Sequence, residues 1–173
     1  YLTEQGFFHI DTDRLATTVH PQALPELVAA FGPQIAVEGC LNRKELAKIA
    51  FSSAENMAKL NQIMHPKIMS EVTRLIESAK VQGFTRVAVD GAALYEAKAE
   101  DICDKILCIL APQEDRRKRI VLRDQISTER ADLRMSAQKS DDYYTSKADG
   151  VIINQSMDQL KADLDQKLKE WML

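Results

Sequence analysis

Two aspartates follow an apolar run near the start of the chain. The run is Gly6-Phe7-Phe8-His9-Ile10, and Asp11 and Asp13 come before a helical pattern begins. An apolar segment that ends in acids is typical of a buried parallel strand that carries carboxylates to the carboxyl edge of a sheet. Open α/β sheets bind ligands at this edge. Asp13 opens the next helix, where it either caps the helix or acts in chemistry, and Asp11 either hydrogen-bonds at the strand end or contacts a substrate.

Arginines are concentrated in one later segment. Helical spacing places Arg116, Arg119 and Arg123 on one stripe, and planar guanidinium groups suit phosphate oxygens. A solvated charged face is the alternative interpretation. Nucleic-acid binding is disfavoured, because aromatic residues are not interleaved with the arginines and the net charge of the chain is −3.

Strands and helices must position these groups. β-branched and apolar runs predict strands at residues 7–10, 86–90, 105–110 and 151–154. Apolar periodicity predicts helices from Asp13 to just before Pro21, around Leu24–Phe31, after Asn42, after Ser52, from Pro66 to Gly83, from Pro112 to Asp124, after Ser127 and after Ser156.

Local signals set the expected boundaries. Gly6 is expected to end a helix that precedes the first strand, and Pro66 to begin one. Residues 36–39 predict a turn, and the polar segment 139–147 is expected to be mobile. Capping boxes are predicted for Asn42 with Glu45, Ser52 with Glu55 and Ser156 with Gln159.

Strands that alternate with helices predict an α/β fold with a parallel, doubly wound sheet. We expect one domain with helical excursions at residues 21–83 and 125–147.

Composition narrows the class of protein. The chain has 173 residues, of which 45% are apolar and 28% charged, enough for one sizeable core, and it has no apolar run long enough to span a bilayer. Its three cysteines cannot all pair with one another, which favours a cytoplasmic location, and no Cys/His spacing suggests zinc.

Several motifs together resemble one known family. Residues 8–13 are similar to its V-I-D-A-D stretch, and Arg119-x-x-x-Arg123-Asp124 is similar to its R-x-x-x-R-D. Further matches are Leu41-Asn42-Arg43-Lys44-Glu45-Leu46, Ile63-Met64-His65-Pro66-Lys67-Ile68, Asp90 to Glu96, Gln138 and Asp149 to Asn154. The order and spacing of these motifs resemble dephospho-CoA kinase, the last enzyme of coenzyme A synthesis.

The resemblance implies a reaction and a fold. The reaction is ATP-dependent phosphorylation of the ribose 3′-hydroxyl of dephospho-CoA. The fold is a three-layer P-loop kinase with a helical substrate-binding insertion and a helical lid. Residues 1–20, 84–124 and 148–173 would form the nucleotide-kinase core, 21–83 the acceptor subdomain and 125–147 the lid.

The resemblance also implies roles for individual residues. Asp13 is expected to be the catalytic base and to bind Mg²⁺ with Asp90, directly or through water, although Asp90 could instead make a structural hydrogen bond. Acceptor contacts are expected at Asp11, His65, Tyr95 and Glu96, of which His65, Tyr95 and Glu96 could instead be packing residues. ATP and lid contacts are expected at Arg119, Arg123, Arg134 and Asn154, and Arg116, Arg117 and Arg130 are expected to be surface residues. Mg²⁺, ATP and dephospho-CoA are the implied cofactor and substrates, with no nucleic-acid or membrane partner.

Two features depart from the family pattern. The phosphate loop G-x-x-x-x-G-K-[ST] is expected to precede Tyr1, and residues from Tyr1 onward are expected to be inactive without it. A protein that had lost the loop would be a non-catalytic CoA- or nucleotide-binding relative, and another small-molecule kinase of this fold is the second alternative. Ala92-Ala93 also stand where the family usually has Pro-Leu.

Overall fold

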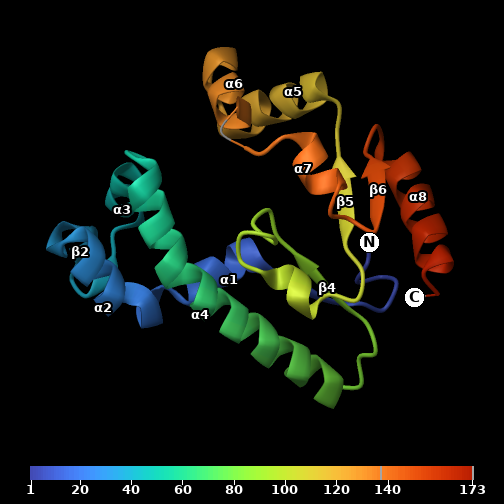
Figure 1. The fold of residues 1–173 in the computed structure, drawn as a ribbon, viewed down its shortest axis with the longest axis horizontal. Helices are drawn as coiled ribbons and strands as arrows, with labels where there is room; N and C mark the ends of the chain where they lie inside the picture. Colours follow the sequence, from blue (N-terminus) through green and yellow to red (C-terminus); the bar gives the residue numbers. More distant parts are fainter. Residues whose placement is uncertain (137, 173) are drawn as a thin grey trace. The chain divides into compact units, whose positions relative to one another are not determined.

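The structure, a computed structural model, describes residues 1–136 and 138–172. The chain divides into two compact units, an N-terminal unit of Tyr1–Asp101 and a C-terminal unit of Ile102–Leu173. Each unit contains a pair of parallel strands with helices packed on it (Figure 1). The parallel pairing agrees with the prediction from the sequence.

The strands of the N-terminal unit are β1 (Phe8–Asp11) and β4 (Val87–Asp90). They run parallel, and the register pairs Phe8 with Val87 and Asp11 with Asp90. Ile10 is almost completely buried, while Asp11 at the end of the strand stays half-buried. Both strands therefore end in an acid at the same edge.

The entry to β1 is a hydrogen-bonded turn that Gly6 ends as predicted, although the residues before Gly6 form a turn and not the expected helix. The N–H of Phe7 donates to the Leu2 carbonyl and the N–H of Gly6 donates to the Thr3 carbonyl, each at 3.1 Å. This hydrogen-bond pair is the Schellman motif, in which the Gly6 position has a positive φ, here 85°. The chain then leaves the turn directly into β1.

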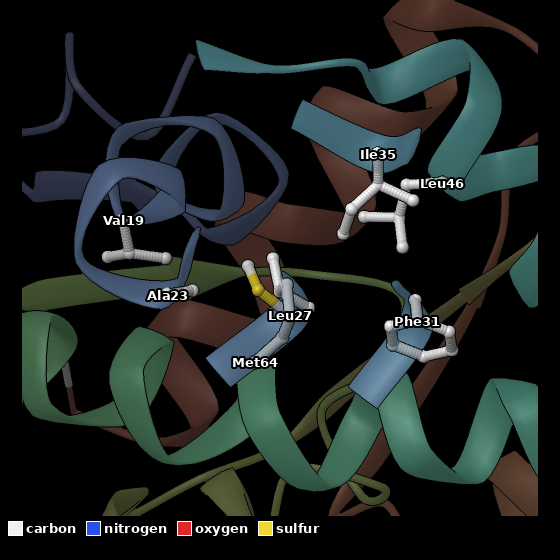
Figure 2. Packing of buried hydrophobic residues seen from close by; sticks show 7 residues of the cluster. All are labelled: Val19, Ala23, Leu27, Phe31, Ile35, Leu46 and Met64. Atoms are coloured by element: carbon white, nitrogen blue, oxygen red, sulfur yellow. The ribbon is translucent and has the colours of Figure 1, made fainter. Parts of the chain in front are cut away.

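Between β1 and β4 the chain is mainly helical. The helices are α1 (Thr12–Thr18), α2 (His20–Phe31), α3 (Arg43–Ala50) and α4 (Ala54–Val81), with the 3₁₀ turn η1 (Pro33–Ile35). Several of the buried side chains in this part of the chain form one apolar cluster (Figure 2), made of Val19, Ala23, Leu27, Phe31, Ile35, Leu46 and Met64. α4 packs against α1, α2 and α3 and also against β1 and β4, so it links the helical cluster to the strands (Figure 1).

Two local predictions in this unit were wrong, and one was incomplete. The turn at Glu38-Gly39 is present, but it joins a short antiparallel hairpin of β2 (Ala36–Val37) and β3 (Cys40–Leu41) that was not predicted. Ser53, not Ser52, caps α4 by accepting from the N–H of Asn56. Pro66 lies inside α4 and does not begin a helix. Proline cannot donate a backbone hydrogen bond, which destabilises a helix. Burial of Met64 and Val72 on either side of Pro66 offsets this loss, so the helix is continuous.

The C-terminal unit contains β5 (Leu107–Leu110) and β6 (Gly150–Ile153), which pair in parallel. The short 3₁₀ turn η2 (Ala99–Ile102) precedes them. Helices α5 (Gln113–Asp124), α6 (Thr128–Ser136) and α7 (Asp141–Thr145) lie between the strands, and α8 (Met157–Glu170) follows. The predicted cap of α8 is confirmed, since Ser156 accepts from the N–H of Gln159 at 3.2 Å.

The segment from Lys139 to Lys147, expected to be mobile, contains a helix. Ser140 caps α7 by accepting from the N–H of Tyr143, and Arg116 of α5 forms a bidentate ion pair with Asp141 at 2.8 and 2.9 Å. A partly buried bidentate pair fixes both its partners more strongly than an exposed one does. The segment is therefore partly helical and is joined to α5 by an ion pair.

Candidate active site

The carboxyl edge of β1 and β4 brings two acids together. Asp11 and Asp90 are register partners at the last position of each strand. Because the strands are parallel, the chain after each acid leaves from the same edge, α1 from β1 and the segment from Gly91 from β4. This is the edge at which open α/β sheets bind their ligands.

Asp11 caps α1. Its Oδ1 accepts a 3.0 Å hydrogen bond from the N–H of Arg14, which is the N3 position of the helix. The cap expected as the alternative role of Asp13 is therefore made by Asp11. Asp13 lies exposed in the first turn of α1, and its carboxylate makes no hydrogen bond or ion pair with residues 1–136 and 138–172.

Asp90 is held through its backbone, while its carboxylate stays exposed. Its carbonyl oxygen accepts a 3.0 Å hydrogen bond from the Oγ1 hydroxyl of Thr12, and its Oδ2 lies 3.6 Å from Nε2 of His9. Neither His9 nor Thr12 was predicted to take part in the site. The alternation of side chains along β1 is the signal that could have identified His9, because residues two apart in a strand lie on the same face.

His65 of α4 contacts the segment that follows β4. Its Nδ1 lies 3.1 Å from the carbonyl oxygen of Glu96. Because a carbonyl oxygen can only accept, the Nδ1–H donates in this contact. The half-buried His65 thus ties the middle of α4 to the turn that carries Tyr95 and Glu96.

That turn has a well-defined end. The N–H of Ala99 donates to the Leu94 carbonyl at 2.8 Å and the N–H of Lys98 to the Tyr95 carbonyl at 3.2 Å, with Lys98 at φ 56°. Tyr95 is half-buried and Glu96 is exposed. Of these two predicted acceptor contacts, Glu96 is therefore the more accessible to a ligand.

The arginines of the C-terminal unit divide into two groups. Arg116 pairs with Asp141, and Arg117 pairs with Asp132 at 2.6 Å and with Glu114, so these partly buried side chains join α5 to α7 and α6. Arg116 and Arg117 were expected to be surface residues, which is wrong. Arg119 is exposed and has no ion-pair partner in the described chain, whereas Arg123 and Arg134 share the carboxylate of Asp124.

A polar cavity of about 490 Å³ lies among these helices. Arg116, Arg117, Asp132 and Asp141 are in its wall, so its arginines are already neutralised by acids. Lys139 also lines the cavity, and it has no ion-pair partner in the described chain.

Asn154 immediately follows β6. Its backbone N–H donates to the carbonyl of Leu110 at 2.7 Å and extends the β5–β6 pairing by one step. Its half-buried side chain makes no hydrogen bond within the described residues.

The predicted site residues fall into two groups. One group lies in the N-terminal unit, with Asp11, Asp13, His65, Asp90, Tyr95 and Glu96, and the other lies in the C-terminal unit, with Arg119, Arg123, Arg134 and Asn154.

Comparison with known proteins decides the family. The family model described as dephospho-CoA kinase matches residues 1–159. The chain belongs to the dephospho-CoA kinase family. A dephospho-CoA kinase of Carboxydothermus hydrogenoformans is 32% identical over 98% of this chain and 85% of its own length, and one of Corynebacterium glutamicum is 37% identical over 98% and 89%.

Solved structures share the fold. The crystal structure of TT1252 from Thermus thermophilus matches with a TM-score of 0.80 and 28% identity over 98% of this chain and 87% of its own. A dephospho-CoA kinase from Campylobacter jejuni matches with a TM-score of 0.67 and 24% identity over 99% and 89%. The α/β fold class of the P-loop kinase type, expected from the sequence, is confirmed.

Residues 1–136 and 138–172 contain no group of three or more His, Cys, Asp or Glu side chains that could hold a metal ion by themselves. No helix in the same part of the chain is long and apolar enough to cross a membrane.

Proposed function

We propose that this family member transfers the γ-phosphoryl group of ATP to the ribose 3′-hydroxyl of dephospho-CoA at the carboxyl edge of β1 and β4, giving coenzyme A. The family match over residues 1–159 supports the reaction. The exposed carboxylate of Asp13 at this edge supports the location. Phosphoryl transfer requires mainly positioning and electrostatic stabilisation, so the roles below are of those kinds.

Asp13 is the catalytic base. It accepts the proton of the acceptor hydroxyl, or orients that hydroxyl, as the hydroxyl oxygen attacks the γ-phosphorus and the bond to the leaving ADP oxygen breaks. A base must be free to accept a proton. Asp13 meets this condition because Asp11 makes the N-cap bond and leaves the Asp13 carboxylate without a partner in the described residues.

The acceptor subdomain comprises residues 21–83, as the sequence suggests. His65 fixes the turn after β4 against α4, so that Tyr95 and Glu96 present one wall to dephospho-CoA. Asp11, at the end of β1, lies next to the helix that carries Asp13 and contacts the acceptor near the reacting hydroxyl. Residues 1–20, 84–124 and 148–173 form the nucleotide-kinase core.

Mg²⁺ bound with ATP fits the acids of this edge. Magnesium prefers oxygen ligands, keeps several of its waters and takes one or two carboxylates together with substrate phosphates. The exposed carboxylates of Asp13 and Asp90 match this mode of binding, and the lack of a larger side-chain cluster in the described chain is consistent with it. When bound, the metal neutralises charge on the phosphates.

Residues 125–147 serve as the lid, with Arg119, Arg123 and Arg134 contacting the phosphates of ATP and Asn154 the adenine. Arg119 is free of acidic partners in the described chain, and Arg123 and Arg134 remain exposed although they share Asp124. Exposed guanidinium groups keep donors available for phosphate oxygens.

The test is the turnover of the full-length protein with ATP and dephospho-CoA. Asp13→Asn is isosteric, and loss of a general base lowers kcat by about 10²–10⁴-fold. The matched control is Asp104→Asn, which makes the same change of charge at an exposed residue far along the chain from the site. Near-normal turnover of Asp13→Asn would show that the role assigned to Asp13 is wrong.

A further inference from the structure

Asp124 lies between two arginines that come from different helices. Asp124 is the last residue of α5, Arg123 precedes it, and Arg134 is in α6. Arg123 donates from Nε to Oδ1 at 2.8 Å and from Nη2 to Oδ2 at 3.1 Å, and Arg134 donates from Nη1 to the same Oδ2. One carboxylate therefore joins two guanidinium groups across the turn between α5 and α6.

Asp124 is an acid at the C-terminal end of α5. The C-terminal end of a helix carries partial negative charge, so a carboxylate there is unfavourable unless cations offset it. The two guanidinium groups would in turn repel each other if no anion lay between them. The arginines accordingly lower the pKa of Asp124, with the hydrogen bond from Arg123 as the main cause. The carboxylate and the two cations stabilise one another.

Asp124 is the least exposed of the three side chains in this ion-paired group. Its side chain is 21% exposed, against 74% for Arg123 and 57% for Arg134. Arginine has five N–H donors, and the bonds to Asp124 leave Nη1 of Arg123 and Nε and Nη2 of Arg134 available. The arrangement holds two cations side by side and still presents donors to solvent.

The ion pairs of Arg116 and Arg117 differ from the Asp124 group in exposure and in the number of arginines per acid. Arg116 and Arg117 are 31% and 26% exposed, and each joins α5 to a neighbouring helix through its own acid. They stabilise the packing of α5, α6 and α7. The Asp124 group instead combines one acid with two arginines, so a net positive charge remains on the surface.

We propose that Asp124 is a positioning residue that holds Arg123 and Arg134 as a paired clamp for the nucleotide phosphates. Two guanidinium groups fixed beforehand lose less conformational entropy on binding than two free side chains. The proposal rests on the proposed function, because it takes ATP phosphates as the ligand of these arginines. Asp124 itself does not touch the substrate.

The experiment measures the KM values for ATP and dephospho-CoA, and kcat, of the full-length protein. Asp124→Asn keeps the shape of the side chain but loses its charge, and we expect the KM for ATP to rise about tenfold while the KM for dephospho-CoA stays within twofold. Asp124→Glu, which restores the charge, should recover most of the affinity. Asp132→Asn is the matched control, since it removes a carboxylate from another arginine of α5 and should leave the KM for ATP unchanged.

A double-mutant cycle separates positioning from general stability. In an Arg134→Met background, Asp124→Asn should raise the KM for ATP by much less than tenfold, because the second arginine is no longer there to be positioned. Thermal unfolding of the same four proteins shows whether Asp124 and Arg134 are coupled in stability as well as in the KM for ATP. Equal effects of Asp124→Asn in both backgrounds would overturn the clamp.

The outcomes distinguish this proposal from the proposed function. If Arg123→Met and Arg134→Met raise the KM for ATP but Asp124→Asn does not, the clamp is wrong and the lid assignment stands. If Asp124→Asn lowers the KM, Asp124 sequesters the arginines and competes with phosphate, which also overturns the clamp. If neither arginine variant changes the KM for ATP, the lid assignment itself fails.

Discussion

A Cβ atom on Gly91 would lie 2.1 Å from the Oγ1 of Thr12. Thr12 begins α1, directly after Asp11, and Gly91 directly follows Asp90. The same Oγ1 donates to the carbonyl oxygen of Asp90. The two residues therefore lie in close contact directly beside the paired strand ends Asp11 and Asp90.

Gly91→Ala should disturb this approach. The added methyl group would overlap Thr12, and such overpacking costs about 1–3 kcal/mol of unfolding free energy. Denaturant unfolding measures the change. Thr12→Ala in the same chain should restore much of the loss, because it removes the overlapping hydroxyl. An unfolding free energy of Gly91→Ala equal to that of the wild type would contradict the close contact between Gly91 and Thr12.

Asp11 should matter to stability through its side-chain oxygen and not through its charge. Asp11→Ala removes the acceptor for the Arg14 N–H and should cost about 1 kcal/mol, whereas asparagine caps helices as well as aspartate does. Thermal unfolding of Asp11→Ala and Asp11→Asn measures both. Equal losses in the two variants would show that the charge, not the cap, is what stabilises α1.

The ion pair of Arg116 with Asp141 should hold α7 in place. Asp141→Asn weakens the bidentate pair, and pairs of this exposure contribute about 0.2–1 kcal/mol, so amide hydrogen exchange in α7 should speed up by as much as about fivefold. Asp142→Asn is the matched control, because it makes the same change in the same first turn of α7. Similar exchange in both variants would contradict the anchoring role.

His20 should make stability depend on pH. Burial, and to a smaller extent the nearby Arg43, lower the pKa of His20 below its ordinary value of 6.5. The unfolded chain therefore binds the proton of His20 more readily than the folded chain does. The contribution of neutral His20 to the unfolding free energy is fully present above pH 6.5 and is lost as the pH falls below this value.

Variants of His20 and Arg43 test this dependence. Unfolding free energies measured from pH 7.5 downward should fall less steeply for His20→Gln than for the wild type. Arg43→Gln should lie between them, since burial remains the main cause. Parallel curves for wild type and His20→Gln would assign the dependence to other groups.

Predictions from the sequence succeeded where a local signal acts alone. Gly6 ends its turn and Ser156 caps α8 as expected, because backbone hydrogen bonds within a few residues decide both. They failed at Pro66, where packing of α4 outweighs local propensity, and they missed the helix α7, which an ion pair joins to Arg116. Tertiary contacts override weak local preferences in this way because burial and ion pairing involve residues distant in sequence.

Hydrophobic period and motif order are properties of the chain alone, so they were enough to predict the α/β class, the parallel strands, the family and the candidate acids. The tertiary structure decided which acid caps α1, which residues flank Asp90 and how Asp124 joins two arginines. These depend on strand register and on the meeting of separate helices, which a linear pattern does not contain. The sequence left open whether Asp13 caps α1, and the hydrogen bond from the Arg14 N–H assigns the cap to Asp11.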